Sequence, residues 1–305
     1  MQLRILAEGL AFPEGPVALA DGSVLLVEIA AGRLTRVAPD GTRATVAEPG
    51  GGPNGAAIGP DGRCYVCNNG GFKWHVEGSF RRPLLQADDY GGGRIERIDL
   101  ATGAVECLYS AAGDVPLKGP NDLVFDRSGG FYFSDLGKVR AREMDRGAVY
   151  YAKADGSSIR EVAFPMVTPN GVGLSPDEAT LYVAETEPAR LWAFDILEPG
   201  VVRKRPWPSP HGGRLVAGLG GYQRFDSLAV DAEGRICVAT LINGGITVID
   251  PNGRHIEQHP MPDPLTTNIC FGGPDLKTAF VTLSWTGRLA AIDWPSPGLK
   301  LNQPF

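Results

Sequence analysis

The sequence has little that would bind nucleic acid or cross a membrane. None of its apolar runs approaches the roughly 20 residues of a transmembrane helix. No long apolar stretch lies near residue 1, so we expect no signal peptide. The formal net charge is -6 and the densest basic stretch is 203–205. Because neutralisation of phosphates dominates nucleic-acid affinity, this charge balance excludes a nucleic-acid partner.

Cysteine and histidine are also scarce. The 5 Cys lie in apolar stretches, and their odd number predicts reduced, buried thiols and a cytoplasmic protein. Cys64 and Cys67 are spaced like a CxxC pair, but residues three apart in a strand point to opposite faces, so we interpret them as core thiols. The 4 His lie outside the expected strand starts described below, which argues against a His-rich zinc site.

Glycine and proline are abundant by contrast, with 41 Gly and 25 Pro in 305 residues. They show no collagen-like period, which indicates many tight turns between short strands. One unit recurs, consisting of a short apolar run, a turn with Asp or Gly, and a second β-rich run. Its six copies are 12–28, 52–68, 119–135, 168–185, 225–240 and 266–282.

Six copies of one β unit predict an all-β fold, a six-bladed β-propeller. A sheet of three or four strands cannot bury both faces alone, so the units must stack around an axis. A β-sandwich is the competing fold, but it would not need six copies. We expect a single domain, 1–305, with blades starting near 12, 52, 119, 168, 225 and 266. The run 3–6 is expected to supply the last strand of the sixth blade.

The copies share a polar residue where the inner strand begins. These residues are Glu14, Asn54, Asn121, Asn170, Asp226 and Asn268. The inner strands of a propeller line its channel, so the six side chains should converge at one mouth. The second strand returns to the same mouth and predicts a wider polar ring. Its members are Glu28, Asn68, Asp135, Glu185, Thr240 and Thr282.

Carboxylates gathered in this way repel each other unless a cation offsets their charge. Oxygen ligands suit hard cations, so the ring predicts a central metal site with one divalent cation, Ca²⁺ first, with Mg²⁺, Mn²⁺, Zn²⁺ or Fe²⁺ as alternatives. The other interpretation of the ring is that Asn and Asp only form the turn that opens each strand.

The segment 70–93 is too long for an ordinary connection between blade strands. We interpret it as a lid that brings Lys73 and Trp74 to the substrate, together with the preceding Asn69. A surface loop that caps apolar blade edges is the alternative. Arg224, two residues before Asp226, is a further candidate for substrate binding.

Several motifs resemble the gluconolactonase and senescence marker protein (regucalcin) family. They are FPEGP (12–16), GPND (119–122), PNGVGLSPD (169–177), DSLAVD (226–231) and TTNICFGG (266–273). The resemblance implies a six-bladed propeller whose axial cation is held by Glu14, Asn170 and Asp226, with Asn121 near substrate and water. Animal members have an Arg two positions before that Asn, where this chain has Gly119, so the residues that face the substrate differ.

The resemblance, together with the ring residues, predicts a metal-dependent lactonase that opens a sugar lactone, an aldonolactone, with metal-activated water. Asp226 is the expected general base, Asn121 and Asn54 contact the substrate, and Asp135 is a second acid–base candidate. The sequence contains no G-x-S-x-G motif, which argues against an acyl-enzyme. The alternatives are a non-enzymatic calcium-binding or regulatory propeller and another metal-dependent hydrolase or hydratase. The identity of the lactone and the oligomeric state stay open.

Overall fold

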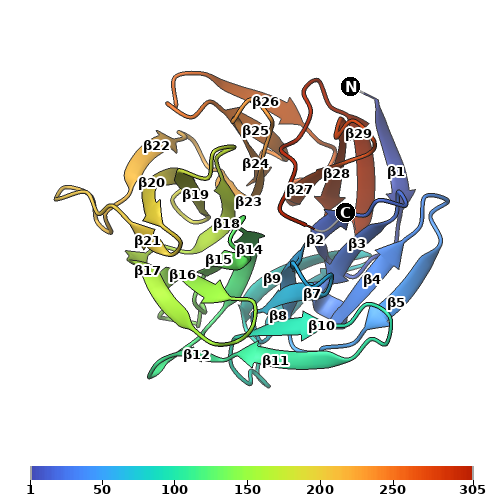
Figure 1. The fold of residues 1–305 in the computed structure, drawn as a ribbon. Helices are drawn as coiled ribbons and strands as arrows, with labels where there is room; N and C mark the ends of the chain where they lie inside the picture. The colour runs from blue at the N-terminus through green and yellow to red at the C-terminus, as the bar shows by residue number, and fades with distance from the viewer. Residues whose placement is uncertain (1, 304–305) are drawn as a thin grey trace.

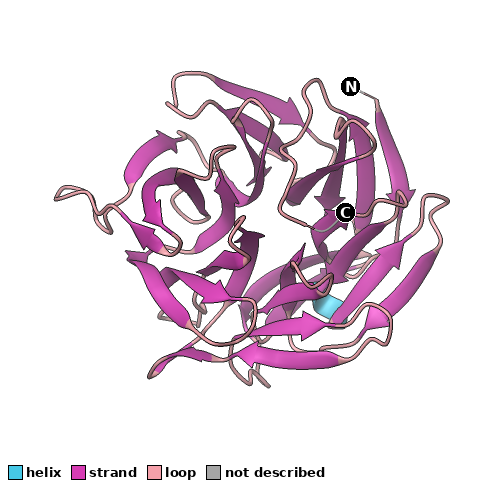
Figure 2. Ribbon diagram, in the orientation of Figure 1, coloured by secondary structure: helices cyan, strands magenta, loops and turns pink. Residues whose placement is uncertain are grey.

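The computed structural model describes residues 2–303, in which six sheets of four or five strands surround a central channel (Figure 1). The protein is therefore a six-bladed β-propeller, as the repeat predicts. The described residues include one helical turn, the 3-10 helix η1 (Ile29–Ala31), shown in cyan in Figure 2. All other regular structure consists of β-strands.

Each blade is an antiparallel sheet whose first three strands follow the chain from the axis outward. The first blade contains β2 (Pro13–Ala18), β3 (Val24–Glu28), β4 (Arg33–Val37) and β5 (Arg43–Ala47). The second contains β6 (Pro53–Ile58), β7 (Cys64–Asn68), β10 (Arg94–Ile98) and β11 (Val105–Tyr109). The third contains β14 (Pro120–Phe125), β15 (Gly130–Asp135), β16 (Gly147–Lys153) and β17 (Ile159–Met166).

The remaining blades follow the same plan. The fourth contains β18 (Pro169–Leu174), β19 (Thr180–Glu185), β20 (Arg190–Glu198), β21 (Val201–Val202) and β22 (Arg214–Gly218). The fifth contains β23 (Arg224–Val230), β24 (Ile236–Leu241), β25 (Gly245–Ile249) and β26 (Ile256–Pro260). The sixth contains β27 (Thr266–Gly272), β28 (Thr278–Leu283), β29 (Arg288–Asp293) and β1 (Leu3–Ala7). The inner strands begin within one residue of the predicted blade starts.

The N-terminal strand completes the last blade. β1 pairs antiparallel with β29, with Leu3 opposite Ile292 and Ile5 opposite Ala290. The sheet of the sixth blade therefore combines the first and last strands of the propeller, which lie side by side in Figure 1. This pairing closes the ring, as expected from the run 3–6.

A repeated aspartate turn joins the first two strands of every blade. Its carboxylate accepts a hydrogen bond from the backbone N–H two residues later, over 2.9 to 3.2 Å. The six residues are Asp21, Asp61, Asp126, Asp177, Asp231 and Asp275. Such Asx turns explain why the repeat carries Asp between its two apolar runs.

The core lies between the blades. The described residues form six hydrophobic clusters, and each cluster draws on two neighbouring blades. Leu174 and Trp192 of the fourth blade, for example, pack in one cluster with Val124 and Tyr151 of the third. Both faces of each sheet are thus buried by its neighbours, which is the reason that a single unit would not fold alone.

The cysteines follow the prediction only in part. Cys64, Cys67 and Cys237 are buried free thiols within these clusters. Cys107 is exposed, because it lies on β11, the outer strand of its blade. Burial was therefore a wrong expectation for Cys107, since an outer strand has no further strand to cover it. No helix in residues 2–303 is long and apolar enough to cross a membrane.

Three further segments lie outside the blade pattern. The insertion 70–93 contains a hairpin of β8 (Phe72–Glu77) and β9 (Phe80–Gln86). A small hairpin of β12 (Ala111–Ala112) and β13 (Val115–Pro116) precedes the third blade. The segment after β29 returns to the channel axis.

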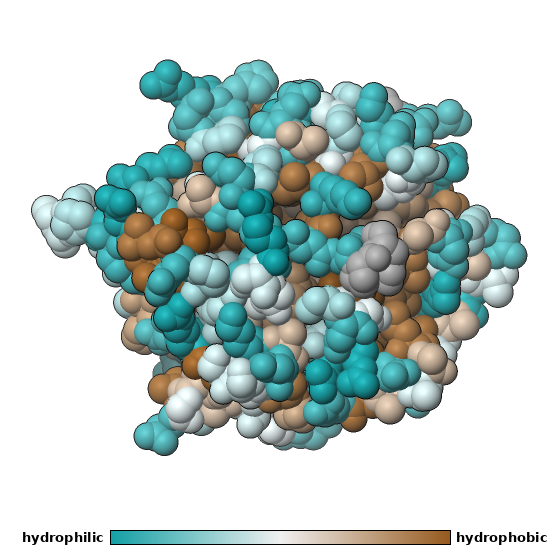
Figure 3. Space-filling view, in the orientation of Figure 1, coloured by the Kyte–Doolittle hydropathy of each residue, from teal (hydrophilic) through white to brown (hydrophobic). Residues whose placement is uncertain are grey.

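Hydrophilic residues cover most of the face seen in Figure 3.

Candidate active site

The predicted inner ring lies at the starts of the six inner strands. Its members Glu14, Asn54, Asn121, Asn170, Asp226 and Asn268 are all buried, with 2 to 9% of each residue exposed. The register between the first two strands shifts beside each of them. Bulges of this kind re-aim side chains, so the same local irregularity sets the direction of the ring residue in every blade.

Glu14 is held by the neighbouring blade. Its Oε2 accepts hydrogen bonds from Asn268 Nδ2 and from the backbone N–H of Gly15, both over 2.7 Å. Burial raises the pKa of Glu14 and these hydrogen bonds lower it, with burial the larger effect. The first and sixth blades therefore meet at a buried carboxylate.

Asp226 is the second buried carboxylate of the ring. Burial raises its pKa well above the ordinary value, and the negative charge of Glu14 raises it further. Asn170 opposes the shift through a hydrogen bond to Asp226. The Nδ2 of Asn170 also donates to Thr186 Oγ1 over 3.1 Å. Asp226 and Glu14 thus interact electrostatically, and each would be stabilised as a carboxylate by a nearby cation.

Asn121 carries an unsatisfied acceptor. Its Oδ1 is buried and has no hydrogen-bond partner among the described residues. An unpaired buried carbonyl costs about 1–3 kcal/mol, so such an atom is uncommon unless a ligand or water satisfies it.

The donor set of the ring fits a hard divalent cation. Two buried carboxylates destabilise each other's charge, and amide oxygens of Asn170 and Asn121 belong to the same ring. Among the described residues, no three His, Cys, Asp or Glu side chains group closely enough to hold a metal ion by themselves. A cation at this position would therefore need amide oxygens in addition to Glu14 and Asp226.

The predicted outer ring consists of residues at the ends of the second strands. Most of its members accept hydrogen bonds from backbone N–H groups of the segment that leads into an inner strand. Asn68 Oδ1 accepts hydrogen bonds from the N–H groups of Gly52 and Gly70, over 2.9 and 3.0 Å. Glu28 accepts the N–H of Ala11 over 2.7 Å, and Glu185 accepts that of Val167 over 2.6 Å. Thr240 instead shares a hydrogen bond with the hydroxyl of Thr247.

Asp135 belongs to this outer group by its contacts. Its carboxylate accepts three backbone N–H groups, those of Lys118 and Gly119 over 2.7 Å and that of Gly137 over 2.9 Å. Burial nevertheless raises the pKa of Asp135. The three hydrogen bonds hold the segment that leads into β14 and the loop that follows β15.

The loop after Asp135 also explains the glycine at position 119. A Cβ on Gly119 would lie 2.4 Å from the carbonyl oxygen of Gly137 and 3.4 Å from Cδ of Lys138. The space that a side chain would need is filled by this loop. A large residue at position 119 is therefore incompatible with the present backbone.

The insertion residues predicted to bind substrate have separate partners. Lys73 is exposed and forms an ion pair with Asp88, with Nζ and Oδ1 2.6 Å apart. Trp74 packs on Phe12 of the first blade, with ring centroids 5.1 Å apart. Asn69 is buried, and its Nδ2 has no partner among the described residues. Asn69 thus has a free donor, Trp74 attaches the hairpin to the first blade, and Lys73 forms its ion pair within the insertion.

Arg224 lies at the start of β23 beside the fourth blade. Its guanidinium forms an ion pair with Glu187 over 3.0 Å, while its buried Nε has no hydrogen-bond partner among the described residues. The Tyr222 ring lies 5.9 Å from the guanidinium carbon. Arg224 therefore keeps one free donor in addition to its ion pair.

Comparison with known proteins identifies the family. Residues 12–284 match the region described as SMP-30/Gluconolactonase/LRE-like. The chain belongs to this family. The family predicted from the motifs is thus confirmed.

Relatives in the SMP-30/gluconolactonase family are named as lactonases. Lactonase drp35 of Staphylococcus saprophyticus is 32% identical over 85% of this chain and 72% of its own length. A gluconolactonase of Zymomonas mobilis is 25% identical over 92% of this chain and 79% of its own length. These relatives agree with the expectation of a lactone-hydrolysing enzyme.

Solved structures share the fold. A gluconolactonase of Xanthomonas campestris superposes with a TM-score of 0.75 at 24% identity, over 96% of this chain and 89% of that one. A calcium-binding regucalcin of Agrobacterium tumefaciens gives a TM-score of 0.74 at 20% identity, over 98% of both chains. Both comparisons support the propeller architecture of this family member.

Asp122 is a buried acid of this family member that sequence reasoning missed. It follows Asn121 in β14, and its Oδ1 accepts the N–H of Leu123 over 2.9 Å. Burial and the charge of Glu14 raise its pKa to about 8. The alternation of a strand places neighbouring residues on opposite faces, so the sequence pattern assigned only Asn121 to the channel. The bulge in β14 removes that alternation.

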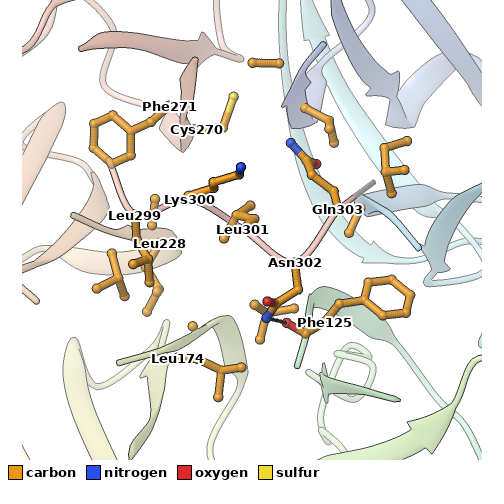
Figure 4. A pocket seen from close by; sticks show the side chains of 18 of the residues that line it. Phe125, Leu174, Leu228, Cys270, Phe271, Leu299, Lys300, Leu301, Asn302 and Gln303 are labelled. Carbon is orange, nitrogen blue, oxygen red and sulfur yellow. Dashed lines mark hydrogen bonds between the residues drawn. The ribbon is translucent and has the colours of Figure 1, made fainter. Parts of the chain in front are cut away.

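A cavity of ≈ 380 Å³ lies in the channel on the far side of the ring from the mouth. Asp122 and Asn268 line its inner end, and apolar residues of the inner strands form its walls. The C-terminal segment crosses its outer end, where Asn302 Nδ2 donates to the carbonyl oxygen of Phe125 over 3.1 Å (Figure 4). The ring thus separates the mouth from an apolar chamber.

Proposed function

We propose that this protein is a metal-dependent hydrolase that opens a sugar lactone, an aldonolactone, to the aldonic acid. The observation that carries the proposal is the ring itself: Glu14 and Asp226 interact at the channel mouth, and Asn121 presents a carbonyl without a partner. The lactonase names of the relatives support the reaction class.

Glu14, Asn170 and Asp226 are the residues that would hold the divalent cation. When bound, the cation supplies positive charge that polarises the lactone carbonyl and offsets the two carboxylates. Because burial and the charge of Glu14 raise the pKa of Asp226, this carboxyl would be an effective base only where positive charge restores its ionised form.

The proton transfers are assigned to Asp226. Its carboxylate takes a proton from the attacking water as the water oxygen bonds to the lactone carbonyl carbon. The ring C–O bond then breaks, and the same proton passes to the leaving alkoxide oxygen, which gives the open hydroxy acid. Asn121 Oδ1 orients the attacking water or a substrate hydroxyl by accepting a hydrogen bond.

The remaining predicted residues have supporting roles in this proposal. Asn54 and Asn69 contact the hydroxyl groups of the substrate, and Arg224 offers its free N–H to a substrate oxygen. Lys73 and Trp74 belong to the hairpin at the mouth. Asp135 holds the loops of the third blade, and its predicted acid–base role stays a prediction.

The test is a pH-stat assay on gluconolactone, galactonolactone, xylonolactone and arabinonolactone, with chelated protein that is re-supplied with one metal at a time. We expect metal-dependent acid release that Asp226→Ala reduces at least about 1,000-fold. Asp275→Asn, in an exposed turn of the sixth blade, is the matched control and should retain full activity. Calcium binding without turnover of any lactone would reject the enzyme and favour a calcium-binding propeller.

A further inference from the structure

A buried lysine joins the third blade to the stem of the inserted hairpin. Lys138 lies in the loop between β15 and β16, and only 1% of it is exposed. Its Nζ donates to the carbonyl oxygens of Asn69 over 2.9 Å and Gly71 over 2.8 Å. The Oδ1 of Asn69 lies 3.5 Å from the same nitrogen. Three acceptors at the start of the insertion therefore surround one side chain.

The same nitrogen contacts both ends of the insertion through aromatic rings. It lies 4.2 Å from the ring centroid of Phe72, at the start of β8, and 5.3 Å from that of Tyr90, after β9. Tyr90 is itself fixed by a 2.7 Å hydrogen bond to the carbonyl oxygen of Lys118. Among the described residues, every hydrogen bond that the Nζ of Lys138 donates goes to Asn69 or Gly71, at the stem of the hairpin.

The hairpin is also attached by the packing of Trp74 on Phe12, described above, and by contacts at its stem and its tip. At its stem, the N–H of Gln86 donates to the carbonyl oxygen of Val139 over 2.8 Å. At its tip, Phe80 stacks on Trp285 of the sixth blade with centroids 5.6 Å apart. Phe80 is 40% exposed, so the tip contact is open to water. Lys138 is thus the most deeply buried attachment of the hairpin.

We propose that Lys138 is a positioning residue for substrate binding, which fixes Asn69 and the hairpin in their arrangement at the channel mouth. The kinetic part of this proposal rests on the lactonase function, whereas the fixing of the hairpin does not. Burial lowers the pKa of Lys138 to about 7. A neutral amine still has N–H donors for both carbonyl oxygens, so the contact does not require the charged form.

The experiment compares Lys138→Met with the wild-type protein by hydrogen–deuterium exchange and steady-state kinetics. Methionine keeps most of the length of the side chain and removes its donors. We expect exchange in 69–90 to accelerate at least about 10-fold, while the strands of the fifth blade stay unchanged. KM should rise about 10-fold with kcat within about twofold, because Lys138 acts through Asn69 and the hairpin.

Lys153→Met is the matched control, since Lys153 also lies near a ring, that of Tyr151 at 5.6 Å, but not near the hairpin. If Lys138→Met does not fold, Phe72→Leu removes the nearer ring and is measured in the same way. Unchanged exchange in 69–90 would overturn the proposal, whether or not the protein is active. Faster exchange with unchanged KM would overturn the role in substrate binding. If the wild type hydrolyses no lactone, the proposed function fails, while the exchange result still decides the structural role.

Discussion

Asn268 and Glu14 are 254 positions apart in the chain, and their side chains are joined by a 2.7 Å hydrogen bond at the channel axis. This contact crosses the seam between the last blade and the first, which β1 also closes at the outer edge. The closure of the ring and the position of the Glu14 carboxylate therefore depend on the same pair of blades.

Replacing Asn268 with Ala should weaken cation binding at the ring. Without the donor, the pKa of Glu14 rises further, so the carboxylate is less available as a ligand. Loss of a residue that orients a metal ligand commonly costs about 10- to 100-fold in affinity. Calorimetric titration of chelated protein with Ca²⁺ measures this effect, and equal affinity in the variant would contradict the assignment of Glu14.

Substitutions of Asn121 and Asn68 by Ala should affect activity and stability differently. Asn121→Ala removes an acceptor that has no partner, so we expect the free energy of unfolding to change by less than about 1 kcal/mol. We expect kcat/KM to fall about 100-fold. Denaturant unfolding and the lactone assay measure the two quantities.

Asn68→Ala is the contrasting variant. Asn68 makes hydrogen bonds to Gly50, Gly52, Gly70 and Glu96 at 2.9 to 3.0 Å. Its loss should destabilise the protein by about 3 kcal/mol or more. If Asn121→Ala destabilised the protein as much, the unpaired carbonyl would have a structural role instead.

Asp135→Asn distinguishes a loop-holding carboxylate from an acid–base residue. The amide cannot accept all three N–H groups, so we expect a loss of about 2–3 kcal/mol in stability. Activity per folded molecule should fall less than about 10-fold, with the pH profile unshifted. A fall of more than about 100-fold at unchanged stability, with one limb of the profile lost, would support the acid–base role instead.

Because His211 is buried, we expect the protein to lose stability in mild acid. It is buried against Trp192 and Phe194, and burial lowers its pKa to about 4. The unfolded chain, with an ordinary pKa of about 6.5, takes up the proton first as the pH falls. Above about pH 6.5 the titration of His211 therefore leaves the free energy of unfolding unchanged. Between about pH 6.5 and pH 4 it lowers the free energy of unfolding by about 1–3 kcal/mol.

His211→Phe keeps an aromatic ring and removes the titration. Denaturation midpoints between pH 4 and 8 should show a smaller slope in the variant. Identical slopes in both proteins would mean that another group controls the acid sensitivity.

The sequence by itself determined the repeat, and with it most of the fold. Each of the six similar units forms one sheet, and one sheet alone cannot bury both of its faces. A closed ring buries both faces of every sheet against its neighbours. The same repeat identified the ring from Glu14 to Asn268, because residues at equivalent positions of equivalent strands must meet at one mouth. Local pattern was sufficient there, since the turn chemistry and strand alternation are encoded in adjacent residues.

Only the tertiary structure decided how these residues interact. The bulge that brings Asp122 near the channel has no signature in the alternation, and the partners of Asp135 come from loops on both sides of it. The role of Lys138 depends on contacts with residues about 50 to 70 positions earlier in the chain. Burial, which shifts the pKa values of Glu14 and Asp226, is a property of the assembled ring, because neighbouring blades and not neighbouring residues exclude the water.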